Sequence, residues 1–112
     1  MNLESSDEVS VVRAIVDQHL DTLGEFQNWH GITADNIREF LVVPRLQVVD
    51  PDDLETEPRP MWVVLAERRD ESGYLIVFDP SDSTWGVAER DGDGGLVMVI
   101  GSDSLQDALE GM

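Results

Sequence analysis

Residues 61–102 place the strongest constraint on how this chain can fold. Four short runs rich in Val, Ile, Leu and aromatic residues lie in this stretch, and clusters of Gly, Asp, Ser and Pro separate them. The pattern predicts four strands joined by short turns, and strands joined in this way are antiparallel neighbours. The predicted strands cover residues 61–69, 74–79, 84–90 and 96–101.

The predicted strands are apolar on both sides, whereas a sheet with one face in water alternates apolar and polar residues. Three arrangements would cover the second side: the sheet curls around it, the 50–60 segment crosses it, or two copies of the chain pack face to face. We expect the last of these, a homodimer. The alternating sets of the first strand are Met61, Val63 and Leu65 on one side and Trp62, Val64 and Ala66 on the other.

Helices are predicted before and after the meander. Residues 6–23 carry apolar side chains at helical spacing, and Gly24 follows as a natural stop. Residues 33–41 predict a second, shorter helix that Thr33 would cap. A short strand is expected at 45–50, and a last helix at 103–111.

These elements predict a single α+β domain over residues 1–112. It would have two N-terminal helices, an antiparallel meander of four to five strands and a short C-terminal helix. The helices would cover one face of the sheet, so that the domain has two layers. At 41% hydrophobic residues, the chain has enough apolar side chains for one core.

The charge of the chain is strongly one-sided. There are 24 acidic and 7 basic residues, which give a net charge of -17, and every base is arginine. Such a surface repels nucleic acids and anionic membranes, and it attracts basic proteins. The alternative is that the acidity only reflects adaptation of the source organism to salt. The densest acidic run is residues 50–60, where the candidate partner contacts are Asp52, Asp53, Glu55 and Glu57.

The sequence also indicates in which cellular compartment the protein is expected. There is no cysteine, which fits a reducing environment. No run approaches the ~20 apolar residues that a membrane helix requires. We therefore expect a cytoplasmic protein that does not engage a membrane.

Few residues suggest chemistry. With two histidines, no cysteine and no recognised catalytic motif, the sequence predicts no catalytic residue, no metal site and no cofactor. His19 is expected to pack its ring at the edge of the core. Asp91 to Gly95 resembles half of a calcium loop, but position twelve is Ser102 instead of the required glutamate, so a tight turn is the better interpretation.

Two functions from different classes follow. The first is a non-enzymatic protein that binds a basic protein partner in an inhibitor, immunity or chaperone-like role. The alternative is a small-ligand-binding or enzymatic domain with a pocket near His30. The residues that could line this pocket are Trp29, His30, Trp62 and Tyr74.

Overall fold

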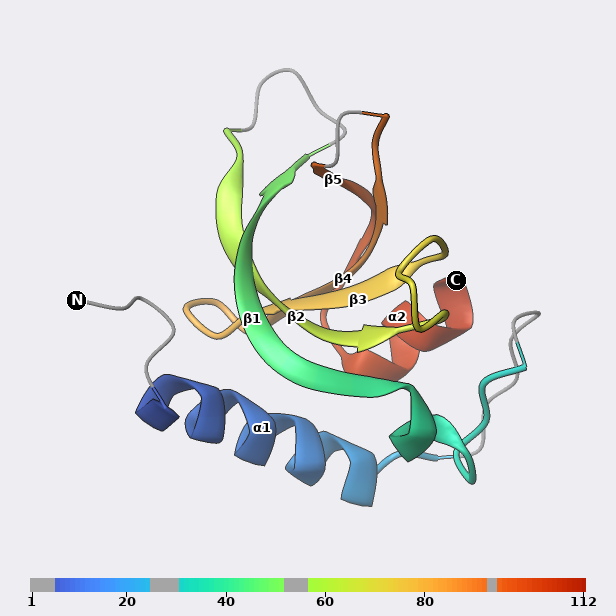
Figure 1. Ribbon diagram of the computed structural model, residues 1–112. Helices are drawn as coiled ribbons and strands as arrows, with labels where there is room; N and C mark the ends of the chain where they lie inside the picture. The colour runs from blue at the N-terminus through green and yellow to red at the C-terminus, as the bar shows by residue number, and fades with distance from the viewer. Residues whose placement is uncertain (1–5, 25–30, 52–56, 93–94) are drawn as a thin grey trace.

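The computed structural model describes residues 6–24, 31–51, 57–92 and 95–112, and it confirms an α+β fold with an antiparallel meander. A helix lies at each end of the chain, and a short 3₁₀ turn precedes the first strand (Figure 1). The elements are α1 (Ser6–Asp21), η1 (Ile37–Phe40), β1 (Leu41–Asp50), β2 (Arg59–Ala66), β3 (Leu75–Asp79), β4 (Thr84–Arg90), β5 (Leu96–Ser102) and α2 (Leu105–Gly111).

The five strands close into a barrel instead of remaining an open layer. Consecutive strands pair antiparallel, and β1 pairs parallel with β5 through Val49–Leu96 and Asp50–Val97. The strands therefore form a ring in Figure 1. Of the three arrangements considered for the second apolar side, the structure has the curled sheet. The expectation of a homodimer rests on the need to cover the second apolar side of the sheet. The closed barrel covers it within one chain, and the oligomeric state stays a prediction.

The inside of the barrel is filled by a set of apolar side chains that we call the inner cluster. Every strand contributes to it, and among the described residues neither helix does. Seven of its eight members are at most 2% exposed, and those that share a strand lie on alternate positions except at Ala66. Its members are Val49, Met61, Val63, Ala66, Leu75, Val77, Ala88 and Leu96.

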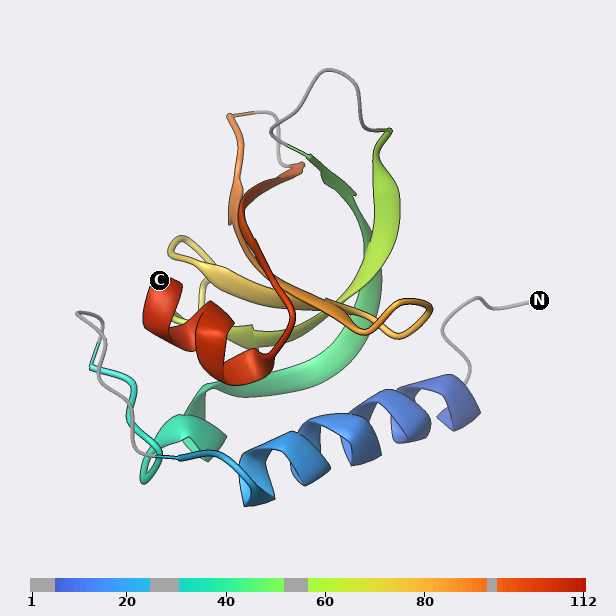
Figure 2. The ribbon, with the colours of Figure 1, turned by 180° about the vertical axis from the view of Figure 1, so that it is seen from behind.

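The outside of the barrel carries a second set, the outer cluster, which the helices cover. Helix α1 packs against β1 and β2, and α2 packs against β4 and β5. Figure 2 shows both helices outside the ring. From the strands come Trp62, Val64, Leu65, Ile76, Phe78, Trp85 and Val87, and from the helices Val12, Val16, Leu20, Leu105, Ala108 and Leu109.

The alternation predicted for β2 is wrong at its end. The pairing of β2 with β3 shifts between Val63 and Leu65, as at a β-bulge. Leu65 therefore joins Val64 in the outer cluster, and Ala66 joins Val63 in the inner cluster. One irregular residue reverses the side on which each later side chain lies.

The second predicted helix, at 33–41, is also wrong. Thr33 does cap a turn, since its Oγ1 accepts from the Asn36 N–H at 3.3 Å and its N–H donates to Asn36 Oδ1 at 2.7 Å. The chain then makes only the four-residue 3₁₀ turn η1 and enters β1 at Leu41. Pro44, which disfavours a helical residue before it, lies in the irregular part of the β1–β2 pairing.

Two details hold β4 and the C-terminal helix in place. A Cβ on Gly86 would lie 2.3 Å from Met98 Sδ, so the glycine allows β5 to pack closely against β4. Helix α2 is capped by Ser104, whose Oγ accepts from the Asp107 N–H at 3.1 Å. Neither described helix is long and apolar enough to cross a bilayer.

Candidate functional site

The four predicted partner contacts lie between β1 and β2. Three of them, Asp52, Asp53 and Glu55, fall outside the described residues. Glu57 is exposed and lies two residues before β2 begins at Arg59. Its carboxylate therefore faces solvent, as a partner contact requires.

The predicted pocket residues are placed at different parts of the barrel. Trp29 and His30 lie outside the described residues. Trp62 is paired with Phe78 at the far end of β3, whereas the Tyr74 carbonyl accepts from the Glu67 N–H in the β2–β3 loop. The two hairpin loops of this region, 67–74 and 80–83, lie on opposite sides of the barrel (Figures 1 and 2). The structure therefore does not bring Trp62 and Tyr74 together.

His19 packs as the helical pattern predicts. Its ring centroid lies 4.8 Å from that of Trp85, which is fully buried and also stacks on Phe78 at 4.2 Å. The imidazole thus forms part of the contact between α1 and the outer cluster. This contact explains the histidine without a catalytic role.

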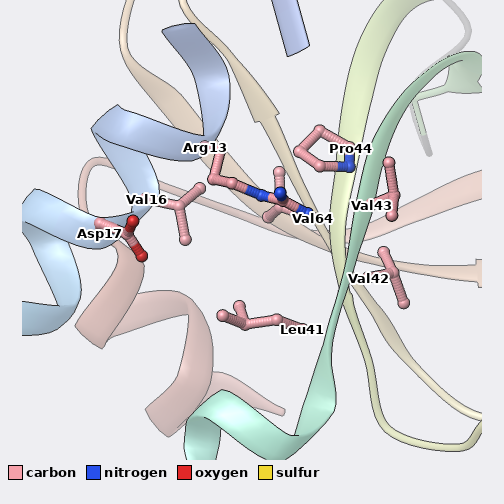
Figure 3. Close-up of a pocket in the computed structure, with 8 residues that line it drawn as sticks. All are labelled: Arg13, Val16, Asp17, Leu41, Val42, Val43, Pro44 and Val64. Atoms are coloured by element: carbon pink, nitrogen blue, oxygen red, sulfur yellow. The ribbon is translucent and has the colours of Figure 1, made fainter. Parts of the chain in front are cut away.

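A groove of about 250 Å³ runs between α1 and β1. Figure 3 shows Arg13 and Asp17 on the helix side, Leu41 to Pro44 on the strand side and Val64 between them. Asp17 accepts from Arg38 at 3.3 Å, and Arg38 also pairs with Asp21 at 3.1 Å. With two arginines near two aspartates, this α1–β1 groove is close to electrically neutral.

A second hollow of about 250 Å³ lies at the other flank of α1, near its N-terminal end. Its floor and sides are apolar, and Val11 on its rim is 58% exposed. The rim also carries two exposed carboxylates, and no basic side chain is among the described residues that line it. We call it the acidic hollow, and its residues are Asp7, Glu8, Val11, Val12, Trp62 and Pro80.

The β3–β4 turn that supplies Pro80 brings further negative charge close to the acidic hollow. Arg59, at the start of β2, pairs with Asp79 at the end of β3 at 3.2 Å and with Asp82 in the turn at 2.9 Å. Hydrogen bonding to Arg59, and then to Thr84, lowers the pKa of the Asp82 carboxyl. One arginine thus serves two carboxylates, so the group keeps a net negative charge at neutral pH.

Asp79 shapes this turn as well. Its Oδ1 accepts from the N–H of Ser81 at 2.9 Å and from the Ser81 hydroxyl at 2.7 Å. Such a local bond is typical of an Asx turn. The turn therefore presents Pro80 and Asp82 in a fixed geometry.

A different ionic group lies at the rim of the barrel interior. Arg45 lies on the same side of β1 as Val49, and Arg90 on the same side of β4 as Ala88, so both arginines project toward the inside. Between them Glu71, from the β2–β3 loop, binds both guanidinium groups, and Arg45 Nη1 donates to its Oε2 at 2.6 Å. Because β1 and β4 are not neighbours in the barrel, this Glu71 cluster links strands across it.

The backbone of Glu71 is as constrained as its side chain. Its φ is 61°, in the left-handed region that residues other than glycine rarely adopt. Hydrogen bonds from Arg45, followed by those from Arg90, lower the pKa of the Glu71 carboxyl below its usual value. The carboxylate is 17% exposed and already has two partners, so a structural role explains it fully.

The aspartate-rich turn after β4 also has a structural explanation where it is described. The Asp91 N–H donates to the Gly95 carbonyl at 3.0 Å, and Asp91 Oδ1 accepts from the Gly95 N–H at 3.0 Å. These bonds close a tight turn, as the glycines indicate. Across the described part of the chain, no three His, Cys, Asp or Glu side chains gather as a metal site would need.

The acidic hollow was not found from the sequence. Its residues come from the first turns of α1, from β2 and from the β3–β4 turn, which are far apart in the chain. The one available signal is Val11, an apolar residue that falls off the buried stripe of α1 that Val12 and Val16 mark.

Comparison of the chain with protein-family models, with curated proteins and with solved structures found no match. The function must therefore be derived from the chemistry of the described surface.

Proposed function

We propose that this is a small, non-enzymatic protein whose acidic surface binds a basic protein partner, in an inhibitor, immunity or chaperone-like role. The observation that carries the proposal is the net charge of -17. In the described part of the chain, ion pairs with arginine involve carboxylates on Asp17, Asp21, Glu71, Asp79 and Asp82. With 24 acidic and 7 basic residues, the chain presents an excess of negative charge to other molecules.

Electrostatics favours a protein as the partner. Negative potential repels the phosphates of nucleic acids and of anionic lipids, whereas it accelerates the encounter with a basic protein at low salt. We propose that this encounter takes place in the cytoplasm, because the chain contains no cysteine.

The test starts from affinity capture with the full chain, followed by binding kinetics of the purified basic partner at several salt concentrations. One variant neutralises the proposed contact loop, with D52N, D53N, E55Q and E57Q. The matched control changes four exposed carboxylates elsewhere by the same charge, with D35N, E39Q, E89Q and D103N. We expect the loop variant to associate more slowly, with a flatter salt dependence, than the control.

Equal association rates for the two variants would show that the loop is not the contact site. The absence of any basic partner that binds in a salt-dependent manner would overturn the proposed function. A separate measurement addresses salt adaptation, since a chain adapted to brine needs molar salt to screen repulsion between its acids. Full stability in dilute buffer would argue against that alternative.

A further inference from the structure

We propose that the acidic hollow is a docking site for a basic, amphipathic segment of the partner protein. One apolar side chain of that segment fills the hollow, and neighbouring Lys or Arg side chains meet the carboxylates of Asp7 and Glu8 on its rim. This inference rests on the proposed function and gives it a location and a recognition chemistry.

The apolar part of the argument starts from two adjacent valines. Val12 is 2% exposed, whereas Val11 is 58% exposed beside Trp62 and Pro80. The hollow, at about 250 Å³, is smaller than the roughly 300–1,000 Å³ typical of small-molecule sites. Its size therefore suits a side chain presented by a larger partner.

The ionic part of the argument is charge complementarity. The first turn of α1 supplies Asp7 and Glu8 to the rim of the apolar floor. The β3–β4 turn that supplies Pro80 also carries Asp82, which pairs with Arg59. In both ribbon views that turn lies close to the first turns of α1 (Figures 1 and 2). Carboxylates on the rim of an apolar floor select a segment that combines Lys or Arg with an apolar residue.

The negative charge on the rim of the acidic hollow also disfavours other occupants, such as a second copy of this chain. A second copy of this chain would bring another net charge of -17 to an acidic rim. The α1–β1 groove, of similar volume, has arginines beside its aspartates and so lacks this selectivity. The comparison of these two hollows makes the groove the natural control.

The experiment uses two capped synthetic peptides as probes, because the natural segment is not identified. One combines Leu and Lys at helical spacing, and the other replaces each Leu by Ser at unchanged charge. Isothermal titration calorimetry at low salt measures their binding to the full chain. We expect the Leu–Lys peptide to bind at least tenfold more tightly, because only this peptide removes an apolar side chain from water when it binds.

Variants then locate the binding. Val11→Ser is expected to weaken the Leu–Lys peptide by about fivefold to tenfold, and D7N/E8Q by about threefold. The matched controls are Val43→Ser, at a valine of the groove that is 66% exposed, and D35N/E110Q, at exposed acids elsewhere. We expect the controls to change binding by less than twofold. Because Asp7 and Glu8 also favour the start of α1, circular dichroism verifies that D7N/E8Q keeps its helix.

The outcomes separate the two proposals. Equal weakening by the hollow variants and by their controls would overturn the docking site, while binding driven by charge would still support the proposed function. Equal affinity for the Ser–Lys and Leu–Lys peptides would likewise overturn the site. If neither peptide binds the unmodified chain at low salt, the docking site is overturned, while the proposed function is decided by the capture of a basic partner. If D7N/E8Q loses its helix, Val11→Ser decides the matter instead.

Discussion

The inner and outer clusters cover the two sides of one sheet by different means. The buried members of the inner cluster are non-aromatic apolar side chains from strands alone, and the cluster exists only because the barrel closes. The outer cluster contains the large aromatic side chains Trp62, Phe78 and Trp85, and it depends on helices that dock from outside. A sheet that is apolar on both sides can therefore be satisfied within one chain, by a barrel on one side and by helices on the other.

The ionic groups at the edges of the two clusters also differ, in how far their charged side chains are exposed to solvent. At the rim of the inner cluster, Glu71 is 17% exposed and binds two arginines. Along the outer flank of α1, Arg38 and its partner Asp17 are each more than half exposed. Charge is thus expected to matter for stability at the barrel rim and to matter little along the helix.

The largest expected effect is at the centre of the outer cluster. Trp85→Ala removes a fully buried ring that contacts His19 and Phe78. We expect the free energy of unfolding to fall by about 3–5 kcal/mol, measured by urea denaturation. Trp85→Phe, which keeps an aromatic ring, should lose clearly less. A loss under about 1 kcal/mol would mean that the helices do not depend on this ring.

A smaller loss of stability is expected inside the barrel, where the side chains are closely packed and leave no room for an added methyl group. Gly86→Ala places a Cβ against Met98, and we expect a loss of about 1–3 kcal/mol in the free energy of unfolding. In a double-mutant cycle, Met98→Ala should recover part of this loss because it vacates the space. Strict additivity of the two changes would contradict a packing conflict between them.

The next effect is a dependence of the free energy of unfolding on pH, which arises at Glu71. Because the folded-state pKa of Glu71 is lowered, its stabilisation is fully present above its unfolded pKa and is lost as the pH falls through the folded value. We expect Glu71→Gln to lose about 1–2 kcal/mol at pH 7. The gap between this variant and the original chain should shrink as denaturation is repeated from pH 6 down to pH 3. A gap that does not depend on pH would exclude the carboxylate charge as its cause.

The smallest effect is expected on the exposed flank of α1. Arg38→Ala removes the ion pairs with Asp17 and Asp21. We expect this variant to lose at most about 0.5 kcal/mol of its free energy of unfolding. Added salt should reduce even this difference. A loss comparable to that of Glu71→Gln would remove the distinction between the barrel rim and the helix surface.

Local patterns predicted most of the elements. Alternating apolar residues located β2 to β5, and the helical stripe located α1, because both signals are contained in consecutive residues. The predicted second helix failed because Ile37, Phe40 and Leu41 fit one helical turn as well as a longer helix. The β-branched Val42 and Val43, followed by Pro44, then favour a strand.

Long-range features could not be predicted in this way. The parallel pairing of β1 with β5 and the bulge at Leu65 depend on which strands meet, and no local pattern encodes that choice. The acidic hollow is likewise assembled from three distant segments. Sequence reasoning therefore located the densest acidic run along the chain, at residues 50–60, but it could not show which distant carboxylates and apolar residues meet on the surface.

The way the ring closes has a consequence for how the chain acquires its structure. The pairs Val49–Leu96 and Asp50–Val97 join the first strand to the last, so this seam can form only after the whole meander is in place. As the chain is synthesised from its N-terminus, β1 has one unsatisfied side until β5 emerges. We therefore expect the seam to be a late event in folding, and its strand edges to be the part of the nascent protein most exposed to misassociation.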